Sequence, residues 1–189
     1  MASLTYNQIQ ISAFVSFVNV SCMHYVTGLG ISNALRTNVA NLIGQNKKIH
    51  AKNLSWFYQL CVFIFAFVEM IVLYSCRGYL AAVYTPLKNV SIILQDNIAI
   101  YSLACIPELL IGTQTTLQRI AGNMCTIIVS QTFSFLLCAG AMGAMLCFYC
   151  DHGVPGLVWG IAAAAWICNF IYWIILARLD WEKLIFKDE

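Results

Sequence analysis

Charged side chains are scarce in this chain of 189 residues. It has ten Lys and Arg and eight Asp and Glu, so 10% of its residues carry a charge, whereas an ordinary soluble domain has about 25%. Hydrophobic residues make up 61%. A soluble domain of this size still exposes about a third of its unfolded surface, which so few charges cannot cover. The composition therefore excludes a disordered chain, a nucleic-acid-binding protein and a water-soluble enzyme, and it indicates a lipid environment.

Long charge-free stretches divide the sequence. A helix of about 20 apolar residues crosses a bilayer core about 30 Å thick. On that criterion the sequence predicts five membrane-spanning helices, at about residues 9–34, 54–76, 97–118, 124–149 and 154–177. A β-barrel is disfavoured because the apolar runs do not alternate, and lipid satisfies no free backbone N–H or C=O group. The predicted fold class is therefore all-α, a multi-pass integral membrane protein.

The connections and the basic residues predict a topology. No Lys or Arg precedes Arg36, so the start does not resemble a secretory signal, and the first span is expected to be a retained helix. Residues 77–96 are expected to form a longer, semi-polar connection that includes an interfacial turn of helix broken at Pro86. If successive spans alternate, one side holds eight basic residues and the other side holds only Arg77 and Lys88. The positive-inside rule then predicts a cytoplasmic C-terminus. The eight are Arg36, Lys47, Lys48, Lys52, Arg119, Arg178, Lys183 and Lys187.

Glu108 is the strongest functional candidate. It lies about 11 residues, or roughly 16 Å, from either end of its predicted span, which puts it near the bilayer midplane. A carboxylate is costly to ionise there, so it points to the binding of a proton or cation. Pro107 removes a backbone donor, which predicts a kink with a freed carbonyl of the kind found around ion sites. The alternative is a neutral Glu108 that is hydrogen-bonded to a neighbouring helix.

The face around Glu108 is small and polar, unlike a lipid-facing stripe. Residues three, four and seven positions apart share a helix face. Along this side of the span lie Ala104 and Arg119. The candidate substrate or ion face comprises Tyr101, Gly112, Gln114 and Thr115.

Other polar residues in the spans are weaker candidates. Glu69 lies about seven residues from the outer end of its span, where a packing or interfacial carboxylate is the simpler interpretation. A single His24 is usually a hydrogen-bonded structural residue, and Arg36 lies at the membrane boundary. Most of the nine Cys lie in spans, where thiols behave as small hydrophobes. Signatures of phosphate-binding loops, zinc peptidases and serine hydrolases are lacking, so we expect neither an enzyme nor a metal site.

Four short motifs resemble, in order, segments of the multidrug and toxic compound extrusion (MATE) transporters. The family's "TRVSNELGAG" segment resembles Thr37-Asn-Val-Ala-Asn41-Leu-Ile-Gly44, and its Arg-x-x-Ile-Ala-x-Leu-Phe-Thr resembles Arg77-Gly-Tyr-Leu-Ala-Ala-Val-Tyr-Thr85. Its "GxxRGxG" turn resembles Leu117-Gln-Arg119-Ile-Ala-Gly122-Asn, and its "GVxGLWxG" resembles Gly153-Val-Pro-Gly156-Leu-Val-Trp-Gly160. The resemblance covers nearly the whole chain.

The resemblance implies an architecture. Residues 1–189 would be helices eight to twelve of twelve, a partial six-helix C-terminal lobe that lacks its seventh helix and the N-terminal lobe. The motif residues Asn41, Gly44, Arg77, Arg119 and Gly122 would then be structural. The sequence departs from the family at Asn38, where an Arg is usual, and at Ala104, where a Tyr is frequent.

The resemblance also implies a function. Glu108 lies eleven residues before Arg119, where the family carries an Asp. The implied activity is export of small organic cations, drugs or other xenobiotics, coupled to H⁺ or Na⁺ as the only cofactor. The expected partners are the bilayer, the cation and the missing lobe, without nucleic acid, in the plasma membrane or in a vacuolar or other internal membrane.

Two alternatives stay open. A lipid-linked oligosaccharide flippase of the same superfamily would favour a strongly cationic cleft, and no Lys or Arg lies within the predicted spans beyond their ends. A non-transporting membrane subunit or truncated product would keep Glu108 buried against protein without a cavity.

Overall fold

The computed structural model describes residues 6–150, 152–179 and 181. Its elements are α1 (Tyr6–Gly44), α2 (Lys48–Tyr84), α3 (Lys88–Ile120), α4 (Met124–Gln131), η1 (Thr132–Ala139), α5 (Gly140–Ala144), η2 (Met145–Tyr149) and α6 (Val154–Ala177). The segments η1 and η2 are π-helical and continue α4 and α5 without a break, so residues 124–149 form one rod, called here the α4–η2 helix. The prediction of an all-α fold is confirmed.

The number of predicted spans is also confirmed. Five helices are long and apolar enough to cross a membrane, and each contains one of the predicted spans. Several are longer than predicted: α2 has 37 residues, about 55 Å at 1.5 Å per residue, which exceeds the hydrocarbon core of a bilayer. The polar ends of α1, α2 and α3 therefore continue as helix beyond the apolar stretch. Lys183 and Lys187, which contribute to the predicted orientation, lie outside the described residues.

The prediction of a long connection over residues 77–96 is wrong. α2 continues through Arg77 to Tyr84 and α3 begins at Lys88, so only residues 85–87 lie outside a helix. Pro86 does mark the break, because proline has no backbone donor and disfavours a helical residue before it. The Thr85 hydroxyl accepts a hydrogen bond from the Leu87 N–H at 3.2 Å across this tight turn.

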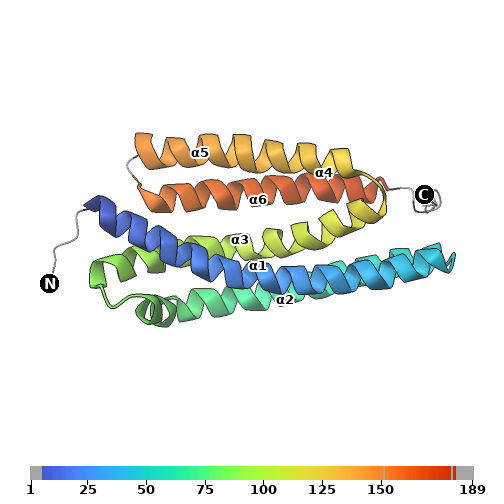
Figure 1. Cartoon of the computed structure of the whole chain (residues 1–189), viewed down its shortest axis with the longest axis horizontal. Coiled ribbons are helices and arrows are strands. Elements are labelled where there is room, and N and C mark those ends of the chain that lie inside the picture. Colours follow the sequence, from blue (N-terminus) through green and yellow to red (C-terminus); the bar gives the residue numbers. More distant parts are fainter. Residues whose placement is uncertain (1–5, 151, 180, 182–189) are drawn as a thin grey trace.

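α3 lies at the centre of the fold. It packs against α1, α2 and α6, and the α4–η2 helix packs on α6 (Figure 1). In the most apolar stretch of α3, 56% of the residues are buried, against 17% in α2. The helix that carries Glu108 is therefore the one that its neighbours cover most completely.

Pro107 lies inside α3, which is helical on both sides of it. Because proline has no N–H, the carbonyl of Leu103 one turn earlier loses its partner within the helix. The indole N–H of Trp166 on α6 donates to that carbonyl at 3.2 Å. The freed carbonyl therefore links α3 to α6.

Two glycines on α6 allow a very close approach to the α4–η2 helix. A Cβ on Gly160 would lie 2.7 Å from Cα of Gly143, and one on Gly156 would lie 2.8 Å from the backbone N of Cys147. Small residues four positions apart permit such backbone contact between membrane helices, where van der Waals packing replaces the hydrophobic effect.

We expect Gly160→Ala to destabilise the fold by about 1–3 kcal/mol, because the added methyl group meets backbone atoms that cannot rotate away. The matched control is Gly140→Ala, on the α4–η2 helix, where an added Cβ has nothing within 4 Å. Unfolding of the chain in mixed micelles, titrated with a denaturing detergent and followed by circular dichroism, measures both. Equal midpoints for the two variants would contradict the proposed packing.

Candidate functional site

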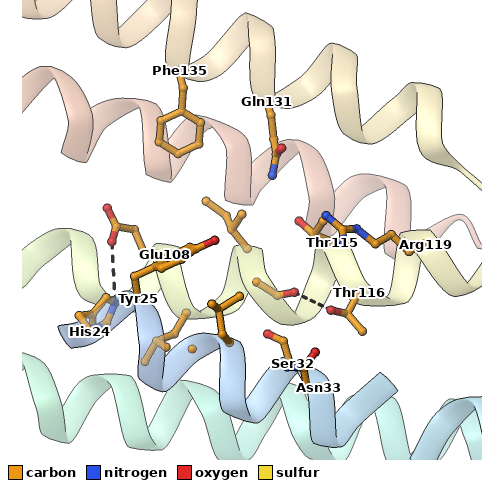
Figure 2. A pocket seen from close by; sticks show the side chains of 15 residues that line it. His24, Tyr25, Ser32, Asn33, Glu108, Thr115, Thr116, Arg119, Gln131 and Phe135 are labelled. Atoms are coloured by element: carbon orange, nitrogen blue, oxygen red, sulfur yellow. Dashed lines mark hydrogen bonds and ion pairs between the residues drawn. The ribbon is translucent and has the colours of Figure 1, made fainter. Parts of the chain in front are cut away.

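Glu108 opens onto a cavity of about 370 Å³ between α1, α3 and the α4–η2 helix (Figure 2). Gly112, Thr115 and Arg119 line the same cavity, so the helical spacing predicted from the sequence brings these four residues together. α1 contributes His24, Tyr25, Gly28, Leu29, Ser32 and Asn33, and the α4–η2 helix contributes Gln131 and Phe135. The Glu108 side chain is 24% exposed and lines this cavity.

Tyr101 holds the carboxylate of Glu108 from the other side. Its hydroxyl donates a hydrogen bond to Oε2 of Glu108 at 2.6 Å. The Tyr101 ring is buried, and Phe17 packs edge-on against it at a centroid distance of 5.2 Å. Tyr101 does not line the larger cavity; with Glu108 it lines a second hollow of about 280 Å³ beside α1. Glu108 thus lies between two hollows.

His24 and Glu69 complete a cluster that sequence reasoning did not assemble. Nδ1 of His24 lies 2.9 Å from Oε1 of Glu69, and Nε2 of His24 lies 3.8 Å from Oε2 of Glu108. α1, α2 and α3 each supply one of the three groups. The sequence did hold one signal, since His24 and Glu108 both lie ten residues before the end of their predicted spans. Treating each residue separately missed the juxtaposition.

Small residues shape the middle of the cavity. A Cβ on Gly112 would lie 3.0 Å from Oγ of Ser32, so the glycine lets α1 and α3 approach. Oγ of Ser32 is buried and has no hydrogen-bond partner within the described part of the chain. Thr116 donates to the carbonyl of Gly112 at 3.0 Å (Figure 2). Ser32 therefore offers a buried hydroxyl beside the open volume.

Gln114 lies apart from the other residues of the predicted face. Its side chain is fully buried, and its Oε1 accepts a hydrogen bond from Nδ2 of Asn169 on α6 at 3.2 Å. It is not among the residues that line the cavity. The structure therefore places Gln114 in the contact between α3 and α6.

The remaining motif residues lie at helix ends and on helix surfaces. Gly122 adopts a φ of 75° in the turn after α3, where a left-handed conformation favours glycine. Gly44 ends α1 without crowding, and the left-handed residue of that turn is Asn46, with a φ of 58°. Asn41 is exposed near the end of α1. The guanidinium of Arg77 lies 4.3 Å from the centre of the Tyr74 ring on the same helix.

The chain has known relatives among extrusion proteins. It is 26% identical over 159 residues to "Multidrug and toxin extrusion protein 1" of Oryctolagus cuniculus, which covers 84% of this chain and 28% of that protein. It is 24% identical over 182 residues to "Protein DETOXIFICATION 56" of Arabidopsis thaliana, covering 92% of this chain and 35% of that protein. No protein-family model matches the chain.

A solved structure has the same fold. The eukaryotic MATE transporter AtDTX14 superposes with a TM-score of 0.89 over 96% of this chain and 40% of its own, at 15% sequence identity. The chain therefore spans between 28% and 40% of the length of these proteins. MATE proteins are membrane transporters and not enzymes. This chain is homologous to the MATE transporters over most of its length, and it has the fold of part of such a transporter.

Proposed function

We propose that this chain takes part in the export of small organic cations, coupled to H⁺ or Na⁺ at Glu108. The observation that carries the proposal is the carboxylate of Glu108 on the wall of a cavity of about 370 Å³ among apolar helices. Sites for small molecules usually measure about 300–1,000 Å³. Their walls combine apolar surface with polar groups that orient the ligand. In this cavity polar side chains such as Ser32, Thr115 and Gln131 line the wall beside apolar ones.

The cavity wall favours an organic cation. Tyr25 and Phe135 line the same cavity as Glu108, from α1 and from the α4–η2 helix (Figure 2). Aromatic faces attract cations through the ring quadrupole, and a carboxylate supplies the opposite charge. A cation with apolar substituents therefore finds both kinds of partner in one cavity.

Competition for one charge explains the coupling. A proton or Na⁺ on Glu108 removes or cancels the negative charge that attracts the organic cation. Binding of the ion from outside would therefore release the substrate, and loss of the ion inside would restore the site. Coupling requires the two ligands to prefer different conformations of the transporter, since a ligand without differential affinity shifts no equilibrium.

The whole pathway needs more than this chain. We propose that residues 1–189 correspond to helices eight to twelve, a partial C-terminal lobe, and that an N-terminal lobe completes the substrate path. We also propose a cytoplasmic C-terminus in the plasma membrane or an internal membrane, from the asymmetry of basic residues.

The two alternative functions fit the cavity less well. An oligosaccharide flippase would favour a cationic cleft, whereas this cavity has Arg119 near one end and Glu108 near the other (Figure 2). A non-transporting subunit would bury Glu108 against protein, whereas its side chain is 24% exposed beside an open volume. Both observations support the transport of cations.

We expect Glu108→Gln to reduce pH-driven exchange of a lipophilic cation at least tenfold, because the amide can neither release a proton nor attract the cation. The measurement uses proteoliposomes with a full-length transporter that carries residues 1–189. The control Asp96→Asn removes an exposed carboxylate on the same helix, outside the cavity, and should leave exchange unchanged. Undiminished exchange in Glu108→Gln would remove Glu108 from the mechanism.

We expect Gly112→Leu to raise KM for a bulky organic cation about tenfold or more and to affect a small one such as tetramethylammonium much less. The new side chain would enter the cavity beside Ser32, where even a Cβ lies 3.0 Å from Oγ. Gly30→Leu is the matched control, because a Cβ on this exposed α1 glycine has nothing within 4 Å. Equal losses for both cations would indicate misfolding and contradict a steric effect on the substrate.

A further inference from the structure

A buried imidazole lies between two carboxylates from different helices. His24 on α1 is 3% exposed. Its Nδ1 lies 2.9 Å from Oε1 of Glu69 on α2, and its Nε2 lies 3.8 Å from Oε2 of Glu108 on α3. Both contacts are ion-pair distances and not hydrogen bonds, and both ring nitrogens are buried. The imidazole thus lies close to carboxyl groups of two different helices. Nothing in the proposed coupling at Glu108 requires Glu69 or His24.

Among the residues that the structure describes, the other groups around the imidazole carry no positive charge. The Tyr101 ring on α3 packs edge-on against His24 at 5.8 Å, and its hydroxyl is already engaged with Glu108. The thiol of Cys105 on α3 donates to the carbonyl of Tyr101, and Tyr25 follows His24 on the cavity wall. Arg119 lines the same cavity but is eleven residues, about 16 Å, further along α3. Within the described residues that line this cavity, His24 is thus the group able to place a positive charge beside Glu108.

The charges of this cluster favour an extra proton. A neutral imidazole has one N–H donor and one bare nitrogen with a lone pair. Between two ionised carboxylates, that bare nitrogen would face an oxygen lone pair without a hydrogen, and the buried cluster would carry two negative charges. Buried charges that lack a partner are costly in a low-dielectric interior. Either the imidazole takes up a proton, or one of the carboxylates does.

We propose that His24 and Glu69 form a second proton-binding site next to Glu108. In this site the proton resides on the imidazole ring, and the carboxylate of Glu69 is its counter-charge at the shorter contact of 2.9 Å. His24 also lines the cavity, and release of the proton leaves a neutral ring there.

The net charge of this cluster changes with each proton, and the consequence for transport rests on the proposed function. With both sites protonated the cluster is neutral, since it holds the Glu69 carboxylate, the imidazolium and an uncharged Glu108. Loss of the Glu108 proton leaves one negative charge, and loss of the His24 proton leaves two. An organic cation therefore competes with two protons, and their occupancies are coupled because the groups are in contact.

The test is the titration of His24 in the chain itself, reconstituted in lipid nanodiscs. Ring nitrogen-15 NMR distinguishes imidazolium from imidazole, and the signals lost in His24→Gln separate His24 from the two other histidines, His50 and His152. We expect the His24 ring to convert reversibly between imidazolium and imidazole over a series of pH values. In Glu69→Gln the midpoint should fall by about one unit or more, a tenfold loss of proton affinity, since an opposite charge in contact is removed.

Two controls separate this effect from altered folding. Glu69→Asp keeps the charge and should restore at least half of the shift, whereas Asp96→Asn removes an exposed carboxylate and should leave the midpoint unchanged. A His24 ring that stays neutral throughout the pH series, or a midpoint that Glu69→Gln does not move, would overturn the proposal. Because this measurement needs no transport, the second site can stand if Glu108→Gln leaves exchange intact, and it can fail while exchange at Glu108 is confirmed.

Discussion

The cost of holding carboxylates among apolar helices is the constraint on which the rest of the structure depends. An ionised carboxylate in a low-dielectric environment loses most of its hydration, and only nearby partners compensate. Glu108 has the Tyr101 hydroxyl at 2.6 Å and the His24 ring at 3.8 Å, and Glu69 has the same ring at 2.9 Å. The three groups come from α1, α2 and α3. Their contacts therefore form only when these helices keep fixed positions along one another.

Polar cross-links hold α3 in the position that this cluster requires. Nε2 of Gln59 on α2 donates to Oγ1 of Thr113 at 3.0 Å, and Asn169 on α6 donates to Gln114. The carbonyl freed by Pro107 adds the bond from Trp166. Such bonds are favourable in a membrane because lipid offers no alternative partner. With these sides of α3 occupied, the side that carries Glu108 and Gly112 is left to face the cavity.

Much of the fold could be predicted because its signals are local. Runs of apolar residues long enough for a bilayer gave the five helices, and Pro86 gave one break. The prediction for residues 77–96 was wrong because it took charged residues as the end of a helix. Charge marks the edge of the apolar core of the membrane, and a helix can continue beyond that edge. In the site, the spacing of Glu108, Gly112, Thr115 and Arg119 was predictable because these residues lie on one helix.

The amino-acid sequence by itself determined the all-helical class, the number of apolar helices and the acidic residue in the middle of the third, since each depends only on composition and on the period of one helix. The tertiary structure alone decided that His24, Glu69 and Glu108 meet, and that Gln114 turns to α6. Such contacts depend on how far each helix is rotated and shifted along its neighbours. Packing between helices sets these quantities, and the pattern along a single helix does not contain them.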